Sequence, residues 1–253
     1  MPRYFIEVAY KGTRYSGFQI QENANSIQAE VEKALKVFFK KDFYLTGSSR
    51  TDAGVHAFQN YFHIDCVEQL NFEKDFTYNL NALLPIDIVI KKIFPVKDNA
   101  HCRFDAVSRE YQYFIYQDKN PFVLETAFYF PYSLDLDKLN EAAIEISHHT
   151  DFESFSKKNT QAKTSICKIE KSIWNRENGL LVYNVIANRF LRGMVKGLVG
   201  TMLRCGVGKL SINDLREIII NKDLSKVDFS PPSHGLCLGS IVFSKEICRD
   251  ISS

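Results

Sequence analysis

The segment from residue 47 to 56 concentrates side chains that could carry out chemistry. It reads Gly-Ser-Ser-Arg-Thr-Asp-Ala-Gly-Val-His, and Gly54 makes a tight loop possible there. Asp52 could act as a nucleophile or a base, with Arg50 beside it to hold a phosphate or the carboxylate itself. In an ordinary turn the same aspartate would cap the backbone and the arginine would be a solvated charge. Residue types alone favour this second interpretation.

Basic residues gather in two stretches without acidic residues, 154–169 and 178–213. The first holds Lys157, Lys158, Lys163 and Lys168, and the second holds Arg189, Arg192, Lys196, Arg204 and Lys209. We expect a helix over 189–205, ended by Gly206, on which Arg189, Arg192 and Lys196 share one face. An RNA phosphate backbone would suit both stretches, and so would plain exposure to water. Because the same helix is rich in apolar residues, its basic stripe needs a partner.

Tyr111 and Tyr113 fall on one face of an expected strand. Cross-strand aromatic packing is the favoured interpretation, and a platform for stacking a nucleobase is its rival. His148, His149 and Asp151 could bind a metal, but adjacent histidines at a helix end point apart, so we expect them at the surface.

Several chemistries lack their usual motifs. The sequence holds no P-loop, no GxGxxG after a strand, no HExxH and no GxSxG. Its six cysteines are scattered without a CxxC pair or a zinc-finger spacing, so we expect reduced thiols in the core and no metal site.

Composition is that of a globular protein, with 45% hydrophobic and 25% charged residues among 253. A net charge of +2 means that any nucleic-acid binding must rest on local charge. The N-terminal residues MPRYFIEVAY do not resemble a signal peptide, and no apolar run is long enough to span a membrane. We therefore expect a soluble, cytoplasmic protein.

Hydrophobic periodicity predicts the same order of elements twice. In the first half, strands are expected over 3–10, 43–48, 57–65 and 86–94. Two helices are expected between these strands. The first follows strand 3–10 and is capped by Asn25 or Ser26, and the second follows strand 57–65. The second helix is marked by Phe72, Phe76, Leu80 and Leu83 and is ended by Pro85. This β-α-β-β-α-β order is typical of a ferredoxin-like fold.

In the second half, strands are expected over 103–116, 164–176, 180–188 and 236–243, with Asn178-Gly179 as a hairpin turn. The helices are placed at Leu136–Ile146, at 189–205 and from Ser211, where Asp214 suits a capping box. We therefore expect an α+β chain of two ferredoxin-like domains, 1–102 with the 47–56 loop and 103–253, sharing a continuous, mostly antiparallel sheet.

The motif Arg50-Thr-Asp-Ala-Gly-Val-His-Ala57 resembles the active-site motif of the TruA-type tRNA pseudouridine synthases. Other segments that resemble this family follow in order: Tyr10–Gln19, Asn81–Ile88, His101–Ala106 with Arg109 and Tyr111, Asp151–Phe155, Met194–Gly200 and Gly235–Leu238. The resemblance spans nearly the whole chain and outweighs the structural interpretations given above.

This resemblance implies an isomerase that converts uridine to pseudouridine at positions 38 to 40 of the tRNA anticodon stem-loop, without a cofactor. It implies two domains around a central cleft and a homodimer that binds tRNA. Asp52 would be the nucleophile, Lys196 its cation, Arg50 a holder of the flipped-out nucleotide, and Tyr111 a stacking or proton-transfer group. The expected RNA-binding residues are Arg14, Lys157, Lys158, Lys163, Arg189 and Arg192.

Four positions depart from the family pattern: Lys11, Phe18, Ser49 and Lys196. Lys196 stands where the family usually has Arg, so it would offer a point charge in place of a bidentate fork. These departures leave open that the chain acts on another RNA, such as ribosomal RNA. A third alternative is a catalytically silent RNA-binding module, and the intact Asp52, Arg50 and Tyr111 argue against it.

Overall fold

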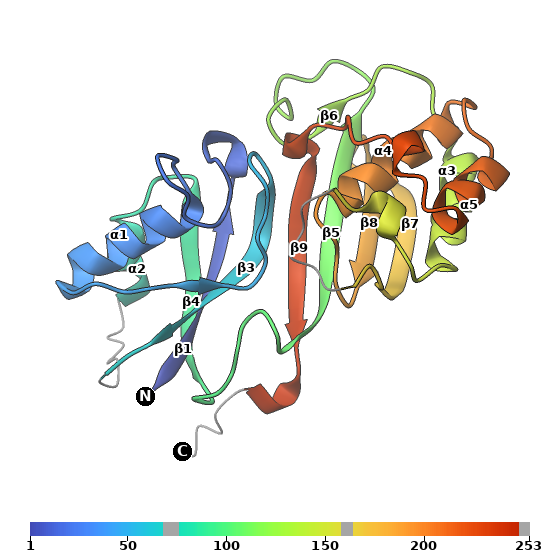
Figure 1. The fold of residues 1–253 in the computed structure, drawn as a ribbon. Coiled ribbons are helices and arrows are strands. Elements are labelled where there is room, and N and C mark those ends of the chain that lie inside the picture. The colour runs from blue at the N-terminus through green and yellow to red at the C-terminus, as the bar shows by residue number, and fades with distance from the viewer. Residues whose placement is uncertain (68–75, 158–163, 248–253) are drawn as a thin grey trace. The chain divides into compact units, whose positions relative to one another are not determined.

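The computed structural model describes residues 1–67, 76–157 and 164–247. The chain is mixed α/β with mostly antiparallel strands (Figure 1). It divides into two compact units. The first is Met1–Val107 together with the segment from Leu238, and the second is Ser108–Cys237. Most of the last strand, from Leu238 onward, thus groups with the first unit.

The sheet of the first unit is built around β1 (Arg3–Tyr10). It runs antiparallel to both β3 (His56–Asp65) and β4 (Ile88–Val96), and β9 (Leu236–Phe243) follows β3 in the strand order. β1 and β9 have the predicted bounds. The side chains of Tyr4, Ile6, Val8 and Tyr10 are all buried, as the alternating pattern predicted.

The strand expected over 43–48 is only β2 (Thr46–Gly47), which pairs with β3. The backbone of Leu45 bonds to side chains of the preceding helix. Its N–H donates to Glu32 over 2.9 Å, and its carbonyl accepts from the Gln28 amide over 2.9 Å. Backbone groups satisfied in this way do not enter a strand ladder.

Helix α1 (Ile27–Phe39) begins as predicted, because the hydroxyl of Ser26 accepts from the backbone of Ala29 over 3.2 Å. Helix α2 is described over Phe76–Asn81, and Phe72 lies outside the described residues. It ends before Leu83 and Pro85. The Asn81 side chain bonds both backbone groups of Ile90 over 2.8 Å, which joins this helix end to β4.

In the second unit, β8 (Leu180–Ala187) pairs antiparallel with β5 (Ala106–Tyr116) and β7 (Ile169–Glu177). The turn between β7 and β8 is the predicted one, with φ of 50° at Asn178 and 80° at Gly179. A short strand that was not predicted, β6 (Phe128–Tyr129), pairs parallel with β5.

The helices of this unit are α3 (Leu136–Ser147), α4 (Met194–Gly206) and α5 (Ile212–Ile220). In Figure 1, α3 lies against β7. The predicted capping box of Ser211 and Asp214 starts α5. Short 3₁₀ helices complete the described elements: η1 (Gly12–Arg14), η2 (Glu153–Phe155), η3 (Leu224–Lys226), η4 (Ser233–Gly235) and η5 (Lys245–Ile247).

The prediction for α4 is wrong at its N-terminal end. Gly193 has φ of 76°, which breaks the helical path, so α4 starts at Met194 and Arg189 and Arg192 precede it. The two arginines therefore share no helix face with Lys196. Gly206 is the last helical residue, and the left-handed conformation falls on Gly208. A side chain at Gly206 would meet Leu139 at 2.8 Å, so close packing explains that glycine.

No helix in the described ranges has the length and apolar character needed to cross a membrane. The five cysteines in the same ranges are buried, and none of them forms a disulfide there. Cys248 lies outside the described residues.

Candidate active site

The loop that carries Asp52 connects β2 to β3 in the first unit. Thr51 is buried and only 7% exposed, while its two neighbours Arg50 and Asp52 are both exposed. A carboxylate placed in this way is open to a bound molecule, and its neighbour Thr51 fixes the backbone below it.

Two contacts hold Thr51. Its hydroxyl lies 2.8 Å from the hydroxyl of Tyr10, and its carbonyl accepts a hydrogen bond from the backbone of Phe18 over 3.1 Å. After Asp52 the chain turns back at once, because Val55 N–H donates to the Asp52 carbonyl over 3.2 Å. Gly54, with φ of 77°, makes that turn possible. The backbone is thus fixed on both sides of the aspartate.

The segment just after β1 lies directly against the far end of this loop. Gly12 donates its backbone N–H to Nδ1 of the buried His56 over 2.9 Å. Its Cα approaches so closely that an added Cβ would lie 2.0 Å from the Val55 carbonyl oxygen. Only glycine allows this approach, and this explains why position 12 in the Tyr10–Gln19 segment is a glycine.

Asn60 on β3 organises the near end of the loop. Its side-chain amide donates to the Ser49 carbonyl over 2.9 Å and to the Tyr10 hydroxyl over 3.1 Å. Its carbonyl oxygen accepts from the backbone of Ser49 over 3.3 Å. Sequence reasoning missed Asn60, because only the structure shows that this asparagine inside a strand has no exposed surface and must satisfy its amide within the protein.

Phe18, one of the departures from the family pattern, is a core residue that is 1% exposed. Its ring stacks on Phe62 with centroids 4.4 Å apart and on Tyr10 with centroids 5.7 Å apart. A Cβ at Gly47 would lie 2.5 Å from this ring. The ring of Phe18 therefore packs against Gly47, the residue at which the loop begins.

A pocket of about 320 Å³ opens beside the loop and is lined by Arg50, Arg103, His101, Phe104 and other residues of the first unit. Two guanidinium groups and an exposed aromatic ring suit a nucleotide or another anionic group with a flat ring. A larger surface hollow of about 740 Å³ lies at Asn221–Ser225 in the second unit. None of the predicted catalytic residues lines it.

Arg14, predicted to bind RNA, is paired with Asp87. The carboxylate accepts from Nε of Arg14 over 2.7 Å and from the Tyr15 hydroxyl over 2.6 Å. Burial alone would raise the pKa of Asp87, but these two hydrogen bonds lower it below its ordinary value. Burial and the same carboxylate raise the pKa of Tyr15, so its hydroxyl stays protonated and donates.

Two of the predicted catalytic residues, Tyr111 and Lys196, lie in the second unit and are half-buried. Tyr111 is on β5 opposite Val185, and its ring meets that of Phe190 edge to face at 5.1 Å. Tyr113 is fully buried and donates to the Pro232 carbonyl over 2.8 Å, so it is a core residue. Lys196 lies in the first turn of α4.

The predicted basic residues come together only in part. Lys157 N–H donates to the Arg192 carbonyl over 3.0 Å, and both side chains are exposed. Arg189 is half-buried, while Lys158 and Lys163 lie outside the described residues. His149 bonds Glu145 over 2.9 Å and Asp151 pairs with Lys222 over 2.9 Å, so these two side chains make ordinary polar contacts.

Comparison with known proteins places this site in a class. A family model described as tRNA pseudouridine synthase matches residues 6–105 and 142–244, a range that includes the 47–56 loop and α4. The chain therefore belongs to the tRNA pseudouridine synthase family.

Individual relatives agree over the full length. The chain is 42% identical to tRNA pseudouridine synthase A of Azobacteroides pseudotrichonymphae, with 99% of this chain and all of the relative covered. It is 43% identical to the protein of that name from Porphyromonas gingivalis and 45% identical to the one from Bacteroides fragilis. In both cases at least 97% of each chain is covered.

Proposed function

We propose that this protein is an isomerase that converts uridine to pseudouridine in the anticodon stem-loop of tRNA, with Asp52 as its nucleophile. One observation carries the proposal: a family match over most of the chain includes an exposed aspartate on a loop braced from both sides. The substrate class follows from the names of the relatives, and the residue roles follow from the resemblance to the family motif.

The reaction breaks the bond between N1 of uracil and C1′ of ribose, turns the base, and joins C5 to C1′. The hydrogen on C5 leaves as a proton, and N1 gains one. Atoms and electrons balance within one nucleotide, so the chemistry needs neither a redox partner nor a group donor. What the protein must supply is a nucleophile, a fixed position for the base, and proton transfer.

Asp52 supplies the nucleophile in this proposal, by attack on C6 of the base or on C1′ of the ribose. Its exposed side chain can reach a nucleotide that has been flipped out of the RNA stem. The contacts of Thr51 and Val55 fix its backbone, so little entropy is lost when the carboxylate is aligned. Bound RNA would exclude water and strengthen each charge interaction at the carboxylate.

The other three roles concern charge and stacking. Lys196 provides the cation for the carboxylate of Asp52, in the position where the family usually has Arg. Arg50 lines the pocket beside the loop and holds the flipped nucleotide through its phosphate or its base. Tyr111 stacks on the target uracil or transfers a proton. Further contacts to the RNA backbone come from Arg14, Lys157, Lys158, Lys163, Arg189 and Arg192.

The architecture we propose is that of two ferredoxin-like domains that share a continuous sheet around a central cleft. In the first unit, the element order β1-α1-β2-β3-α2-β4 and the pairings of β1 and β2 with β3, and of β1 with β4, support it. By the same resemblance we propose a homodimer that acts in the cytoplasm.

Release of tritium tests the chemistry directly. tRNA labelled with tritium at C5 of uridine should lose its label to water when incubated with the wild-type protein, because C5 must give up its hydrogen. Asp52→Asn should release none while binding tRNA with nearly unchanged affinity. The control is Asp42→Asn, an exposed carboxylate paired with Lys36 at 2.7 Å, which should release label at the wild-type rate.

The same assay separates the alternatives. Release from ribosomal RNA but not from tRNA would contradict the proposed substrate and leave the chemistry intact. No release from either RNA, with binding retained, would indicate a silent binding module. Normal release by Asp52→Asn would refute the role of the aspartate.

A further inference from the structure

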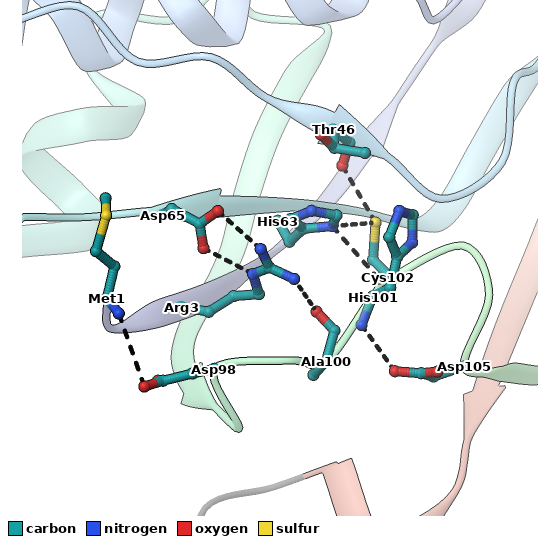
Figure 2. Close-up of polar contacts among 10 residues, drawn as sticks. All are labelled: Met1, Arg3, Thr46, His63, Asp65, Asp98, Ala100, His101, Cys102 and Asp105. Carbon is teal, nitrogen blue, oxygen red and sulfur yellow. Dashed lines mark hydrogen bonds and ion pairs between the residues drawn. The ribbon is translucent and has the colours of Figure 1, made fainter.

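Three side chains that can bind metals meet in the first unit, and one of them, His101, lines the pocket that Arg50 also lines. His63, His101 and Cys102 form the one group of three potential ligands found in the described ranges, and their ligand atoms all lie within 4.8 Å of one another. Figure 2 shows the imidazole of His63 and the sulfur of Cys102 turned toward each other, with the ring of His101 beside the sulfur.

Strand pairing sets the position of His63. It lies on β3 opposite Thr46 of β2, and its ring faces the segment that follows β4. The Cys102 sulfur is 3.2 Å from Nδ1 of His63 and 3.1 Å from the Thr46 carbonyl oxygen. Sulfur and imidazole nitrogen are therefore already near the separation of about 3.5 Å that a tetrahedral zinc ion imposes on two such ligands.

Polar contacts fix the segment that carries the other two ligands. The Ala100 carbonyl accepts from Arg3 over 2.7 Å, and Arg3 also holds Asp65 through two bonds of 2.7 Å. The Cys102 carbonyl accepts from the Ser48 hydroxyl over 2.6 Å. The backbone that carries Cys102 is therefore held in place before any ion binds, so less entropy is lost when this ligand coordinates.

Burial gives the site an inner and an outer side. Cys102 has no exposed surface and His63 is 6% exposed, whereas His101 is half-buried and lines the pocket of about 320 Å³ together with Thr46. An ion could thus enter from the pocket, meet His101 first, and keep a fourth position toward the pocket for water. A thiolate with two imidazoles is a donor set that suits zinc and related borderline ions and disfavours magnesium or calcium.

We propose that His63, His101 and Cys102 form a binding site for one divalent ion of the zinc class. On binding, the thiol of Cys102 loses its proton to solvent and a metal–sulfur bond replaces the sulfur–hydrogen bond. Nδ1 of His101 accepts from the backbone of Arg103 over 3.1 Å, so coordination by this ring rearranges the turn after it. An ion bound to all three residues would connect that turn, through His101, to His63 on β3.

Sequence spacing could not reveal this site. His63 and Cys102 lie 39 positions apart, and only the packing of the segment after β4 against β3 brings them together. The three residues include no pair at zinc-finger spacing, which is why no metal site was expected.

Binding of Co²⁺ tests the proposal with a readout independent of catalysis. The full-length protein, stripped with a chelator and kept reduced, should bind one Co²⁺ per chain with the charge-transfer absorption of a thiolate ligand, and one equivalent of Zn²⁺ should abolish that absorption. Cys102→Ser should lose this band. His101→Gln, which removes a ligand, should weaken the affinity for Zn²⁺ by at least the factor of about 10–100 that the loss of an outer-shell partner alone costs.

The matched control is Cys66→Ser, which removes another buried thiol of the same unit. It should bind Co²⁺ and Zn²⁺ as the wild type does. The proposal is overturned if the folded wild-type protein binds no stoichiometric Zn²⁺, if Cys102→Ser and His101→Gln bind Zn²⁺ as tightly as the wild type, or if Cys66→Ser abolishes the thiolate band. Circular dichroism of each variant shows that a loss of binding is not a loss of fold.

Discussion

The hydroxyl of Tyr10 lies 2.8 Å from the hydroxyl of Thr51, the residue directly before Asp52. Tyr10 ends β1 and is 5% exposed, and its hydroxyl also accepts from Asn60 over 3.1 Å. One phenol oxygen therefore connects the central strand of the first unit to the loop that carries the proposed nucleophile. The position of the aspartate depends on this buried group, which itself touches no substrate.

Tyr10→Phe should lower the rate of pseudouridine formation without abolishing it. The change leaves the Thr51 hydroxyl without this buried partner, so the free energy of unfolding should fall by about 1–2 kcal/mol. We expect kcat to drop about tenfold as the loop loses its fixed position, while the affinity for tRNA stays nearly constant.

The control for this change is Tyr183→Phe, which removes a buried hydroxyl paired with Ser172 over 2.8 Å in the second unit. Urea unfolding should show a comparable loss of stability for both variants, but only Tyr10→Phe should lose kcat in the tritium assay. Equal losses of kcat would mean that the effect comes from general destabilisation.

Gly12→Ala should disrupt the same loop from its other end. The new methyl group would lie 2.0 Å from the Val55 carbonyl oxygen, and neither a Cβ nor a backbone oxygen can rotate out of the way, so one backbone segment must move. We expect a loss of about 2–3 kcal/mol in stability and most of the activity. Gly208→Ala is the comparison, because its φ of 76° causes strain but no atom lies within 4 Å of the new methyl. It should cost about 1 kcal/mol and leave kcat unchanged.

Periodicity predicted the elements whose residues face one core and whose ends have local signals. β1 and β9 have their predicted bounds, and Ser26 and the Asn178-Gly179 turn act as predicted. Periodicity predicted the wrong bounds where a contact with a distant part of the chain, or the backbone conformation of one residue, sets the end of an element. Leu45 looks like a strand residue, yet Glu32 and Gln28 take its backbone bonds. The positive φ of Gly193 prevents α4 from starting before Met194, and the apolar pattern across 189–205 does not reveal this.

The candidate site was likewise predicted only in part. The residue types of the 47–56 loop predicted where to look, and the family resemblance supplied the roles. The support of that loop was not predictable, because Asn60 and Tyr10 lie 50 positions apart and neither has a distinctive neighbour. Long-range pairing of two strands brings them together, and a single sequence does not state that register.

Lys196 should be needed for turnover more than for binding. Lys196→Ala removes the proposed cation beside the nucleophile, and we expect kcat to fall about 100-fold or more with a small change in tRNA affinity. Lys196→Arg should keep most of the activity, since it restores the charge and the side chain usual in the family. If Lys196→Ala reacts at the wild-type rate in single-turnover assays, the lysine does not support the nucleophile.

Arg14 should contribute to RNA affinity although it is paired with Asp87. Its side chain remains 62% exposed, so the guanidinium can face a phosphate while Nε keeps its bond. Arg14→Gln should weaken tRNA binding and reduce the slope of log affinity against log salt by about 1. Lys36→Gln removes an equally exposed, paired cation on α1 and should leave the slope unchanged. A change in kcat without a change in slope would assign Arg14 a structural role.

Glu145 should make the second unit sensitive to acid. Two bonds of 2.8 Å from Arg216 and one of 2.9 Å from His149 lower the pKa of this carboxyl from 4.5 to about 2. Because the folded state binds its proton less readily than the unfolded state, the stabilisation is complete above pH 4.5 and is lost as the pH falls toward about 2.

Glu145→Gln should therefore lower the free energy of unfolding by about 1–2 kcal/mol at neutral pH, a value reduced by the half-exposed position of Arg216. In urea titrations over a series of pH values, the difference between wild type and variant should shrink below pH 4.5 and nearly vanish near pH 2. Asp42→Asn, at an exposed ion pair, should change stability by less than about 0.5 kcal/mol throughout. A difference for Glu145→Gln that stays constant across this range would show that the ion pair does not lower the pKa, and that lost packing explains the effect.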